Sequence, residues 1–284
     1  MIVTRFAPSP TGLLHLGHAF AALTAFDLAR AGAGRFLVRI DDLDQARARD
    51  TFVTALLEDL AWLGLAWETP LRRQSAEAAT YTEALDRLTA EGLLYPCFCT
   101  RKEIEAEAAA AAEAPHGTLG PVYPGTCRGL NAAERERRTS AGEPYVVRLD
   151  NRRALSLVTG PLTFTEEGHG PQGETGVITA ESGLHGDVVL ARKDMPASYH
   201  LAVVVDDALQ GVTHVTRGED LFPVTSLHRL LQALLDLPTP RYHHHRLILD
   251  ASGRRLAKRD HAATLRSLRE SGVTPAEVRR TLGL

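Results

Sequence analysis

The stretch 5–18, RFAPSPTGLLHLGH, joins a short strand-like run to a helix. Residues 2–6 are β-prone, the prolines and glycine of 7–12 indicate a turn, and apolar residues from 13 to 30 recur at helical spacing. Strand, turn and helix in this order are typical of the first unit of an α/β fold.

The same stretch places two histidines at the start of the predicted helix. His15 and His18 are three residues apart, which puts both imidazoles on one helix face. The N–H groups of a helix N-terminus favour phosphate, and Gly17 lets a nucleotide approach the backbone closely. Arg5, at the strand end, is delivered to the carboxyl edge of the sheet. We therefore expect a nucleotide site here.

Alternation of strand and helix continues along the chain. Residues 35–40 predict a second strand, and residues 51–63 predict the helix that follows it. Residues 201–207, LAVVVDD, predict a buried parallel strand that ends in two carboxylates. Further helices are expected at 80–91 and 221–235, and further strands at 145–149, 187–191 and 246–250. The fold class predicted is α/β with a parallel sheet and crossover helices.

Composition limits the function classes. The 284 residues are 44% hydrophobic, and their formal net charge is −3. Near-neutral charge argues against a general nucleic-acid coat but leaves room for a local basic face. No run reaches the roughly 18 apolar residues of a membrane span, and the first residues do not resemble a secretory leader. We expect a cytoplasmic protein with no membrane partner.

These motifs lead to a family resemblance. The stretch 5–18 resembles the HIGH signature of class I aminoacyl-tRNA synthetases, and its lead RFAPSPTG is similar to the glutamate and glutamine branch. Residues 254–259, RRLAKR, resemble the KMSKS loop of that family. Lys258 matches the second lysine of that loop, whereas Arg255 and Ala257 replace its first lysine and its serine.

The resemblance implies a Rossmann-type catalytic domain that binds ATP together with Mg²⁺. It implies that His15, His18 and Lys258 are catalytic and stabilise the charge that develops on the phosphates. The ATP site implied in this way consists of His15, Gly17, His18 and Lys258.

The resemblance also implies a glutamate site. Arg5 suits the side-chain carboxylate by bidentate geometry, and Asp41 stands where the family usually has a Glu against the ammonium group. Tyr199 and Arg217 match the remaining contacts of the family. The residues assigned to the glutamate site are Arg5, Phe6, Ala7, Pro8, Ser9, Asp41, Tyr199 and Arg217.

Three cysteines indicate a metal site. Cys97, Cys99 and Cys127 are an odd number close in sequence, which argues against a disulfide framework. They supply three ligands of a tetrahedral zinc site, and general ligand preference favours His116 as the fourth. Residues 123–128, YPGTCR, instead resemble the zinc element of a short branch of the family, which favours Tyr123. We expect one structural Zn²⁺ bound by Cys97, Cys99, Tyr123 and Cys127.

The resemblance suggests four segments. Residues 1–94 are the first half of the Rossmann domain, 95–195 an inserted zinc-binding, acceptor-like module, and 196–240 the second half. Residues 241–284 contain the KMSKS-like loop and a short helical C-terminus. An Ala/Glu-rich tract at 103–114 is good helix-forming material within the module. Because residues 259–284 are all that follow Lys258, the sequence predicts no anticodon-binding domain.

This organisation resembles a truncated branch of the family. The resemblance implies a ligase, expected to be a monomer, that activates L-glutamate with ATP without tRNA and transfers it to the queuosine base in the anticodon of tRNA(Asp). One alternative is a free-standing domain that charges the 3′ end of tRNA(Glu). Another is a non-catalytic tRNA-binding module, although the joint presence of His15, His18 and Lys258 argues against it.

Overall fold

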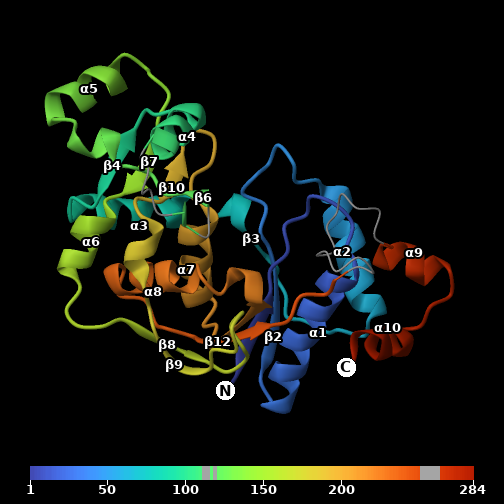
Figure 1. The fold of residues 1–284 in the computed structure, drawn as a ribbon. Coiled ribbons are helices and arrows are strands. Elements are labelled where there is room, and N and C mark those ends of the chain that lie inside the picture. The colour runs from blue at the N-terminus through green and yellow to red at the C-terminus, as the bar shows by residue number, and fades with distance from the viewer. Residues whose placement is uncertain (111–115, 118–119, 250–262) are drawn as a thin grey trace.

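A central sheet with helices on both faces organises the chain in the computed structural model (Figure 1). The structure describes all residues except 111–115, 118–119 and 250–262, and it gives no side-chain detail for residues 107–121. The expected basic run 254–259, with Lys258, therefore lies outside the described residues.

The strands of the central sheet follow the order β3, β2, β1, β11, β12, β8, β9. The backbone N of Thr213 donates to O of Val3 at 3.0 Å, which places β11 beside β1. All neighbours are parallel except β8 and β9. The strands are β1 (Val3–Phe6), β2 (Arg35–Ile40), β3 (Arg72–Arg73), β8 (Thr163–Glu166), β9 (Gly176–Thr179), β11 (His214–Gly218) and β12 (Arg241–His245). The order from β3 to β12 is the doubly wound Rossmann-type arrangement, which confirms the predicted fold class.

Helices cover both faces of this sheet (Figure 1). Phe36, Val38 and Ile40 of β2 contribute to the core beneath α1, whereas Arg39 faces α7. Continuous burial from Phe36 to Ile40, with successive side chains on opposite faces, is expected for a strand enclosed on both sides. On the first face lie α1 (Leu16–Ala31), α2 (Asp50–Trp62), α9 (Leu265–Glu270) and α10 (Pro275–Leu282); on the second lie α3 (Ala78–Ala90), α7 (Tyr199–Leu209) and α8 (Thr225–Leu234).

A second, antiparallel sheet forms a smaller module at the upper left of Figure 1. Its order is β10 (Val189–Arg192), β7 (Val146–Leu149) and β4 (Leu94–Cys97). The stretch 95–195 thus supplies strands to both sheets, because β8 and β9 extend the central one. Around the module are α4 (Arg101–Ala110), α5 (Ala132–Ser140), α6 (Asn151–Leu157) and the short pair β5 (His116–Gly117) and β6 (Gly120–Pro121).

Two predicted strands are wrong. Residues 201–207 lie in α7 and are all buried, so the helix has no polar face from which a helical period could be detected. Its valines also favour a strand interpretation. Instead of the strand expected at 246–250, the structure has β12 at Arg241–His245, and residues 246–248 are not in a strand. Tertiary contacts bury Tyr242 and His244 of β12, which the polar sequence RYHHH does not indicate.

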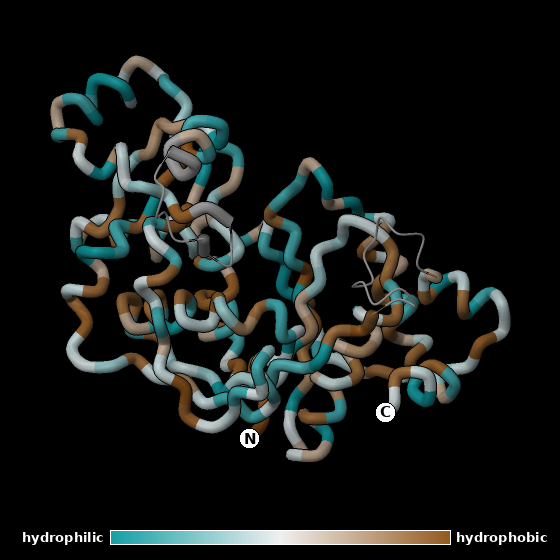
Figure 2. The backbone as a smooth tube through the Cα atoms, in the orientation of Figure 1, coloured by the Kyte–Doolittle hydropathy of each residue, from teal (hydrophilic) through white to brown (hydrophobic). Residues whose placement is uncertain are grey.

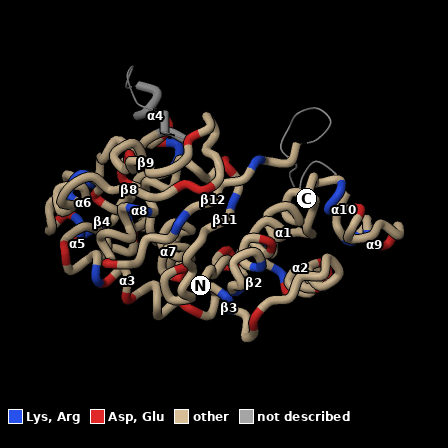
Figure 3. The backbone as a smooth tube through the Cα atoms, turned by 90° about the horizontal axis from the view of Figure 1, so that it is seen from below, with Lys and Arg blue, Asp and Glu red and all other residues tan. Residues whose placement is uncertain are grey.

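Hydropathy and charge follow this architecture. Hydrophobic residues concentrate in the elements next to the sheets, whereas α5, at the upper left of Figure 2, is largely hydrophilic and buries no residue. Acidic and basic residues are interspersed over both halves of the molecule (Figure 3). Among the described residues, no helix is both long and apolar enough to cross a bilayer.

Candidate active site

The two histidines meet at the N-terminus of α1, as the sequence predicts. His15 caps the helix, and its Nδ1 accepts a hydrogen bond from N of Gly17 at 3.1 Å. Nδ1 of His18 accepts from N of His15 at 3.2 Å, and the two ring centroids are 3.9 Å apart. Because Nδ1 is an acceptor in both rings, each imidazole is neutral and has its proton on Nε2. Each ring therefore has one N–H, on Nε2, and the pair lies at the positive end of the helix.

Gly17 is required by the first of these rings. A Cβ at Gly17 would lie 3.0 Å from Cε1 of His15, which is tighter than ordinary van der Waals contact. The missing side chain thus lets His15 fold back and cap its own helix, in addition to the role in nucleotide approach expected from the sequence.

Described residues on both sides of the basic run contact α1 or the residues just before it. After the run, Thr264 forms an antiparallel bridge with His15, and N of Leu265 donates to O of Leu14 at 2.8 Å. Before the run, the guanidinium of Arg246 lies 4.7 Å from the ring centroid of Phe20 in α1. The chain therefore leaves from and returns to the helix that begins with the histidine pair.

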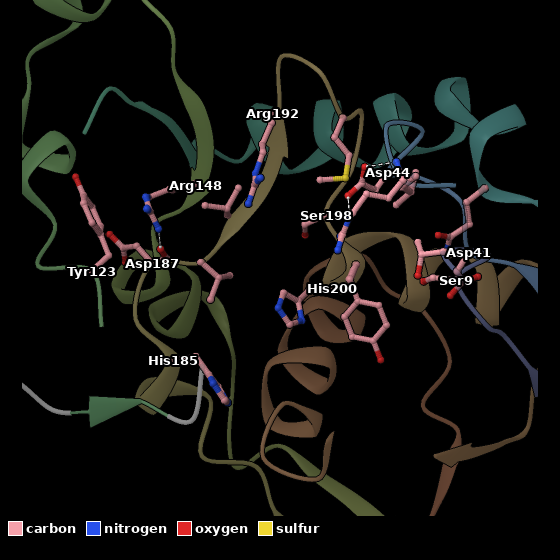
Figure 4. A pocket seen from close by; sticks show the side chains of 18 of the residues that line it. Ser9, Asp41, Asp44, Tyr123, Arg148, His185, Asp187, Arg192, Ser198 and His200 are labelled. Carbon is pink, nitrogen blue, oxygen red and sulfur yellow. Dashed lines mark hydrogen bonds and ion pairs between the residues drawn. The ribbon is translucent and has the colours of Figure 1, made fainter. Parts of the chain in front are cut away.

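A cavity of about 520 Å³ lies between the loops that follow β1 and β2 and the antiparallel module. Ser9 and Asp41 line one end, Tyr123, Arg148 and Asp187 the other, and His200 the middle (Figure 4). Three of the residues expected at the glutamate site line it, namely Ser9, Asp41 and Tyr199.

Asp41 directly follows β2 and is held from two sides. Its carboxylate accepts from Nε of Arg39 at 2.8 Å, and its backbone N donates to O of Pro8 at 3.2 Å. Burial raises the pKa of Asp41 to about 6, although Arg39 opposes the shift. The bond to Pro8 fixes the loop that contains Ser9 against the end of β2.

Arg5 has a carboxylate partner within the protein. Nε and Nη2 of Arg5 donate to the two oxygens of Asp207 at 3.0 and 3.2 Å, and Nη1 of Arg39 reaches the same carboxylate at 2.6 Å. Burial would raise the pKa of Asp207, but the two guanidinium groups hold it below its usual value. Arg5 does not line the cavity, and its role as a glutamate ligand stays a prediction.

Arg217, on β11, is surrounded by uncharged groups. Its Nε donates to Nε2 of His244 at 3.0 Å, its Nη1 to Nδ1 of His228 at 3.0 Å, and its Nη2 to Oγ1 of Thr225 at 2.7 Å. Nη1 also lies 3.5 Å from the hydroxyl of Tyr199, which lines the cavity. Arg217 is thus placed directly behind the cavity wall.

The remaining residues expected at the glutamate site have mixed environments. Phe6 is buried in the core under α1, Pro8 is buried, and Ala7 is half-buried. Tyr199 is the first residue of α7 and not the residue before a strand. The two carboxylates expected at a strand end, Asp206 and Asp207, are buried ion-pair partners of arginines from β1, β2 and β3.

Three cysteine sulfurs gather at the edge of the module. The Sγ atoms of Cys97, Cys99 and Cys127 lie within 4.8 Å of one another. The hydroxyl of Tyr123 is 3.5 Å from Sγ of Cys99 and accepts from N of Cys127 at 2.8 Å. His116 lies on β5, and its side chain is outside the described part of the chain. Three thiols and one phenol are a donor set that suits a tetrahedral zinc ion.

The sequence analysis did not predict several residues that line the cavity. They include two cationic residues, Arg148 of β7 and Arg192 of β10, and two imidazoles, His185 and His200. A signal was present for His200 alone, since it directly follows Tyr199. The others come from the antiparallel module, whose position over the sheet the sequence does not indicate.

Comparisons with known proteins place this site in a family context. The family model described as tRNA synthetases class I (E and Q), catalytic domain, matches residues 1–284. The glutamyl-Q tRNA(Asp) synthetase of Rhodobacter capsulatus is 51% identical over 286 aligned residues that cover 100% of both chains. The protein of the same name from Symbiobacterium thermophilum is 43% identical and covers 98% of this chain and 84% of its own.

Solved structures agree with the observed fold. The glutamate-tRNA synthetase from Elizabethkingia anophelis superimposes with a TM-score of 0.75 at 28% identity, over 91% of this chain and 53% of its own. This chain therefore spans about half the length of that enzyme. The methionyl-tRNA synthetase of Mycobacterium tuberculosis, at 12% identity and a TM-score of 0.60, shares the fold alone.

Proposed function

The chain belongs to the class I tRNA synthetases of the glutamate and glutamine type, and from this premise we propose that it is an ATP-dependent glutamate-activating ligase. It forms glutamyl-adenylate without tRNA and then transfers the glutamate to the queuosine base in the anticodon of tRNA(Asp). The observation that supports this reaction most strongly is the 51% identity, over the full length of both chains, to a relative named for it.

The first step is attack by an oxygen of the glutamate α-carboxylate on the α-phosphorus of ATP. A new P–O bond forms, the bond to the β-phosphate oxygen breaks, and pyrophosphate leaves. Nε2–H of His15 and of His18 donates to the phosphate oxygens as their charge builds, and Lys258 adds a cation. Mg²⁺ bound with the ATP neutralises phosphate charge in such reactions.

The amino acid lies in the cavity beside this phosphate site. Asp41 accepts from its ammonium group, and Ser9 and Tyr199 line its path. Arg217 lies behind Tyr199 and supplies the positive charge for the side-chain carboxylate.

In the second step a hydroxyl of the queuosine cyclopentene ring attacks the carbonyl carbon of the adenylate. An ester bond forms, the hydroxyl loses its proton, and AMP leaves.

We further propose that Cys97, Cys99, Tyr123 and Cys127 bind one structural Zn²⁺. The mutual approach of the three sulfurs and the distance from Tyr123 to Cys99 support this ligand set. The ion would cross-link β4 to the segment 123–127 and fix the wall of the cavity to which Tyr123 belongs.

Glutamate-dependent exchange between ATP and pyrophosphate, measured without tRNA, tests the activation step. We expect exchange with L-glutamate, and its absence from zinc-replete protein would refute the proposed activity. Labelled glutamate, transferred to queuosine-containing tRNA(Asp) and mapped by nuclease digestion, tests the second step. Label in the anticodon arm supports the proposal, whereas label at the 3′ end of tRNA(Glu) supports the charging domain instead.

Metal analysis tests the zinc site. We expect one zinc per chain in the wild type and in His116→Ala, and a loss of zinc in Tyr123→Phe. Tyr145→Phe, at a more exposed tyrosine of the same module, is the matched control. Loss of zinc from His116→Ala with retention in Tyr123→Phe would reverse the assignment of the fourth ligand.

A further inference from the structure

A chain of hydrogen bonds leads from Arg217 to the middle of the cavity. Arg217 donates through Nη1 to Nδ1 of His228, and Nε2 of His228 lies 3.2 Å from Nδ1 of His200. His228 is buried, whereas His200 lines the cavity. Two imidazoles thus connect the guanidinium to the place where substrate is expected.

The direction of every bond in this chain is determined. A guanidinium can only donate, so Nδ1 of His228 must accept and Nε2 of His228 must have the proton. That proton is donated to Nδ1 of His200, which must therefore accept. The proton of His200 is then on Nε2, for which no partner is found among the described residues. Arg217 in this way fixes the tautomer of a histidine that it does not contact.

A similar arrangement holds Arg217 from its other side. Its Nε donates to Nε2 of His244, so the proton of that ring is on Nδ1 and is donated to Glu166 at 2.6 Å. The same carboxylate accepts from N of His244 at 2.9 Å and N of Gly168 at 2.8 Å. Glu166 is therefore satisfied through His244 and makes no direct contact with Arg217.

The environment keeps these rings neutral. Burial lowers the pKa of His200 to about 4, and burial together with the charge of Arg217 lowers that of His228 well below its usual value. Burial also lowers the pKa of His244 to about 4, although Glu166 opposes the shift. Neutral rings at physiological pH agree with the bond directions.

We propose that His200 is a substrate-binding residue that donates its Nε2–H to the side-chain carboxylate of the amino acid, and that His228 is a positioning residue that fixes this donor. The inference rests on the proposed glutamate activation and adds a selectivity device to it. Arg217 and His200 offer only donors, and the hydroxyl of Tyr199, which accepts from Arg217, can itself donate, so the three groups together suit a carboxylate. The amide of glutamine would bring its NH₂ group against one of these donors and is rejected.

Two substitutions at position 200 separate the donor from the ring. His200→Asn keeps an acceptor where Nδ1 faces His228 but removes the group at Nε2. His200→Gln places an amide NH₂ near the position of Nε2 and so keeps the donor. His214→Asn, at the far end of β11 from Arg217, is the matched control outside the cavity.

Steady-state exchange assays with ATP, pyrophosphate and either glutamate or glutamine provide the readout. We expect His200→Asn to raise the KM for glutamate about 10- to 100-fold, as for loss of one hydrogen bond to a charged group, with little change in the KM for ATP. His200→Gln should recover most of this loss. His228→Leu should lower the preference for glutamate over glutamine about tenfold or more, because the tautomer of His200 is then free to change.

The result that would overturn the inference is a KM for glutamate in His200→Asn within twofold of the wild type. Equal impairment in His200→Asn and His200→Gln would also overturn it, since packing of the ring would then be the cause. Calorimetric titration with glutamate, which needs no turnover, separates this inference from the proposed function. If the wild type binds glutamate but shows no exchange, and His200→Asn binds it more weakly, the proposed function is refuted while this inference stands. A wild type that neither exchanges nor binds glutamate would refute both.

Discussion

Two buried arginines on neighbouring strands have opposite electrostatic environments. Arg5 on β1 is 5% exposed and forms a two-pronged ion pair with Asp207, which also binds Arg39. Arg217 on β11 is 6% exposed, and its side-chain partners are two imidazoles and two hydroxyls. The charge of Arg5 is compensated by the protein, whereas that of Arg217 is compensated only indirectly, through His244 and Glu166.

This difference distinguishes a charge that is paired directly within the protein from one that has no direct counter-ion. Burying an ion without a counter-ion costs free energy, so such a group persists where it has another use. Next to a cavity lined by Tyr199 and His200, the use that we propose is the binding of an anion. Arg5 links β1 to α7 through its ion pair with Asp207, whereas Arg217 is the arginine that we propose to bind the substrate carboxylate.

The largest expected effect is on stability. Arg5→Met leaves Asp207 buried with Arg39 as its remaining guanidinium partner, and we expect it to lower the free energy of unfolding by about 3–5 kcal/mol. Chemical denaturation measures this loss. Arg35→Met, which removes the exposed pair with Glu68 at the start of β2, should cost at most about 1 kcal/mol. Equal losses of unfolding free energy in Arg5→Met and Arg35→Met would show that the buried ion pair of Arg5 contributes no more than an exposed one.

Arg217→Met should affect binding instead of folding. We propose that Arg217 pairs with the substrate carboxylate, and loss of one such charge-assisted interaction corresponds to roughly 1.5–3 kcal/mol, or about a 10- to 100-fold lower kcat/KM for glutamate. The free energy of unfolding should change less than in Arg5→Met, because no buried carboxylate loses a direct ion-pair partner. Exchange kinetics and denaturation of the same variant check both parts. A variant that unfolds as easily as Arg5→Met would contradict the comparison.

Asp59 of α2 is a third buried charge, and its ion pair is long, since Nη1 of Arg269 lies 3.7 Å from its Oδ1. It tests whether a weakly compensated ion is costly where no ligand is expected. Neither carboxylate oxygen has a hydrogen-bond partner, and burial raises its pKa to about 6. A raised carboxyl pKa means that the folded state binds the extra proton, so stability falls as pH rises from about 4 to 6. Asp59→Asn should therefore stabilise the protein by about 1–3 kcal/mol at pH 8 and much less at pH 4. If Asp59→Asn does not raise the free energy of unfolding at pH 8, the surroundings of Asp59 already compensate its charge.

The smallest expected effect is a pH dependence of glutamate binding. Burial raises the pKa of Asp41 to about 6, so the group that faces the ammonium becomes neutral below that pH. The KM for glutamate should rise up to about tenfold per pH unit below 6 and be flat above it. Asp41→Asn should show a high KM with no such limb. If the KM for glutamate still rises below pH 6 in Asp41→Asn, a group other than Asp41 causes the pH dependence.

Elements with a complete local sequence pattern lie where the sequence predicts them. The strand and helix flanking the stretch 5–18 are β1 and α1, and the expected strand at 35–40 is β2. The sequence predicts a strand where α7 lies, because a helix buried on all sides has no polar face. It also failed to find His200, because nothing local distinguishes a ligand-facing histidine from a packed one.

The sequence by itself determined the class of chemistry: a histidine pair on a strand–turn–helix unit, three clustered cysteines, and a family relationship over the whole chain. Only the tertiary structure decided which charges are compensated and which are available. The carboxylate partner of Arg5 lies 202 residues away in sequence, and the side-chain partners of Arg217 come from α7, α8 and β12. Electrostatics and tautomers depend on such distant contacts, and no local pattern encodes them.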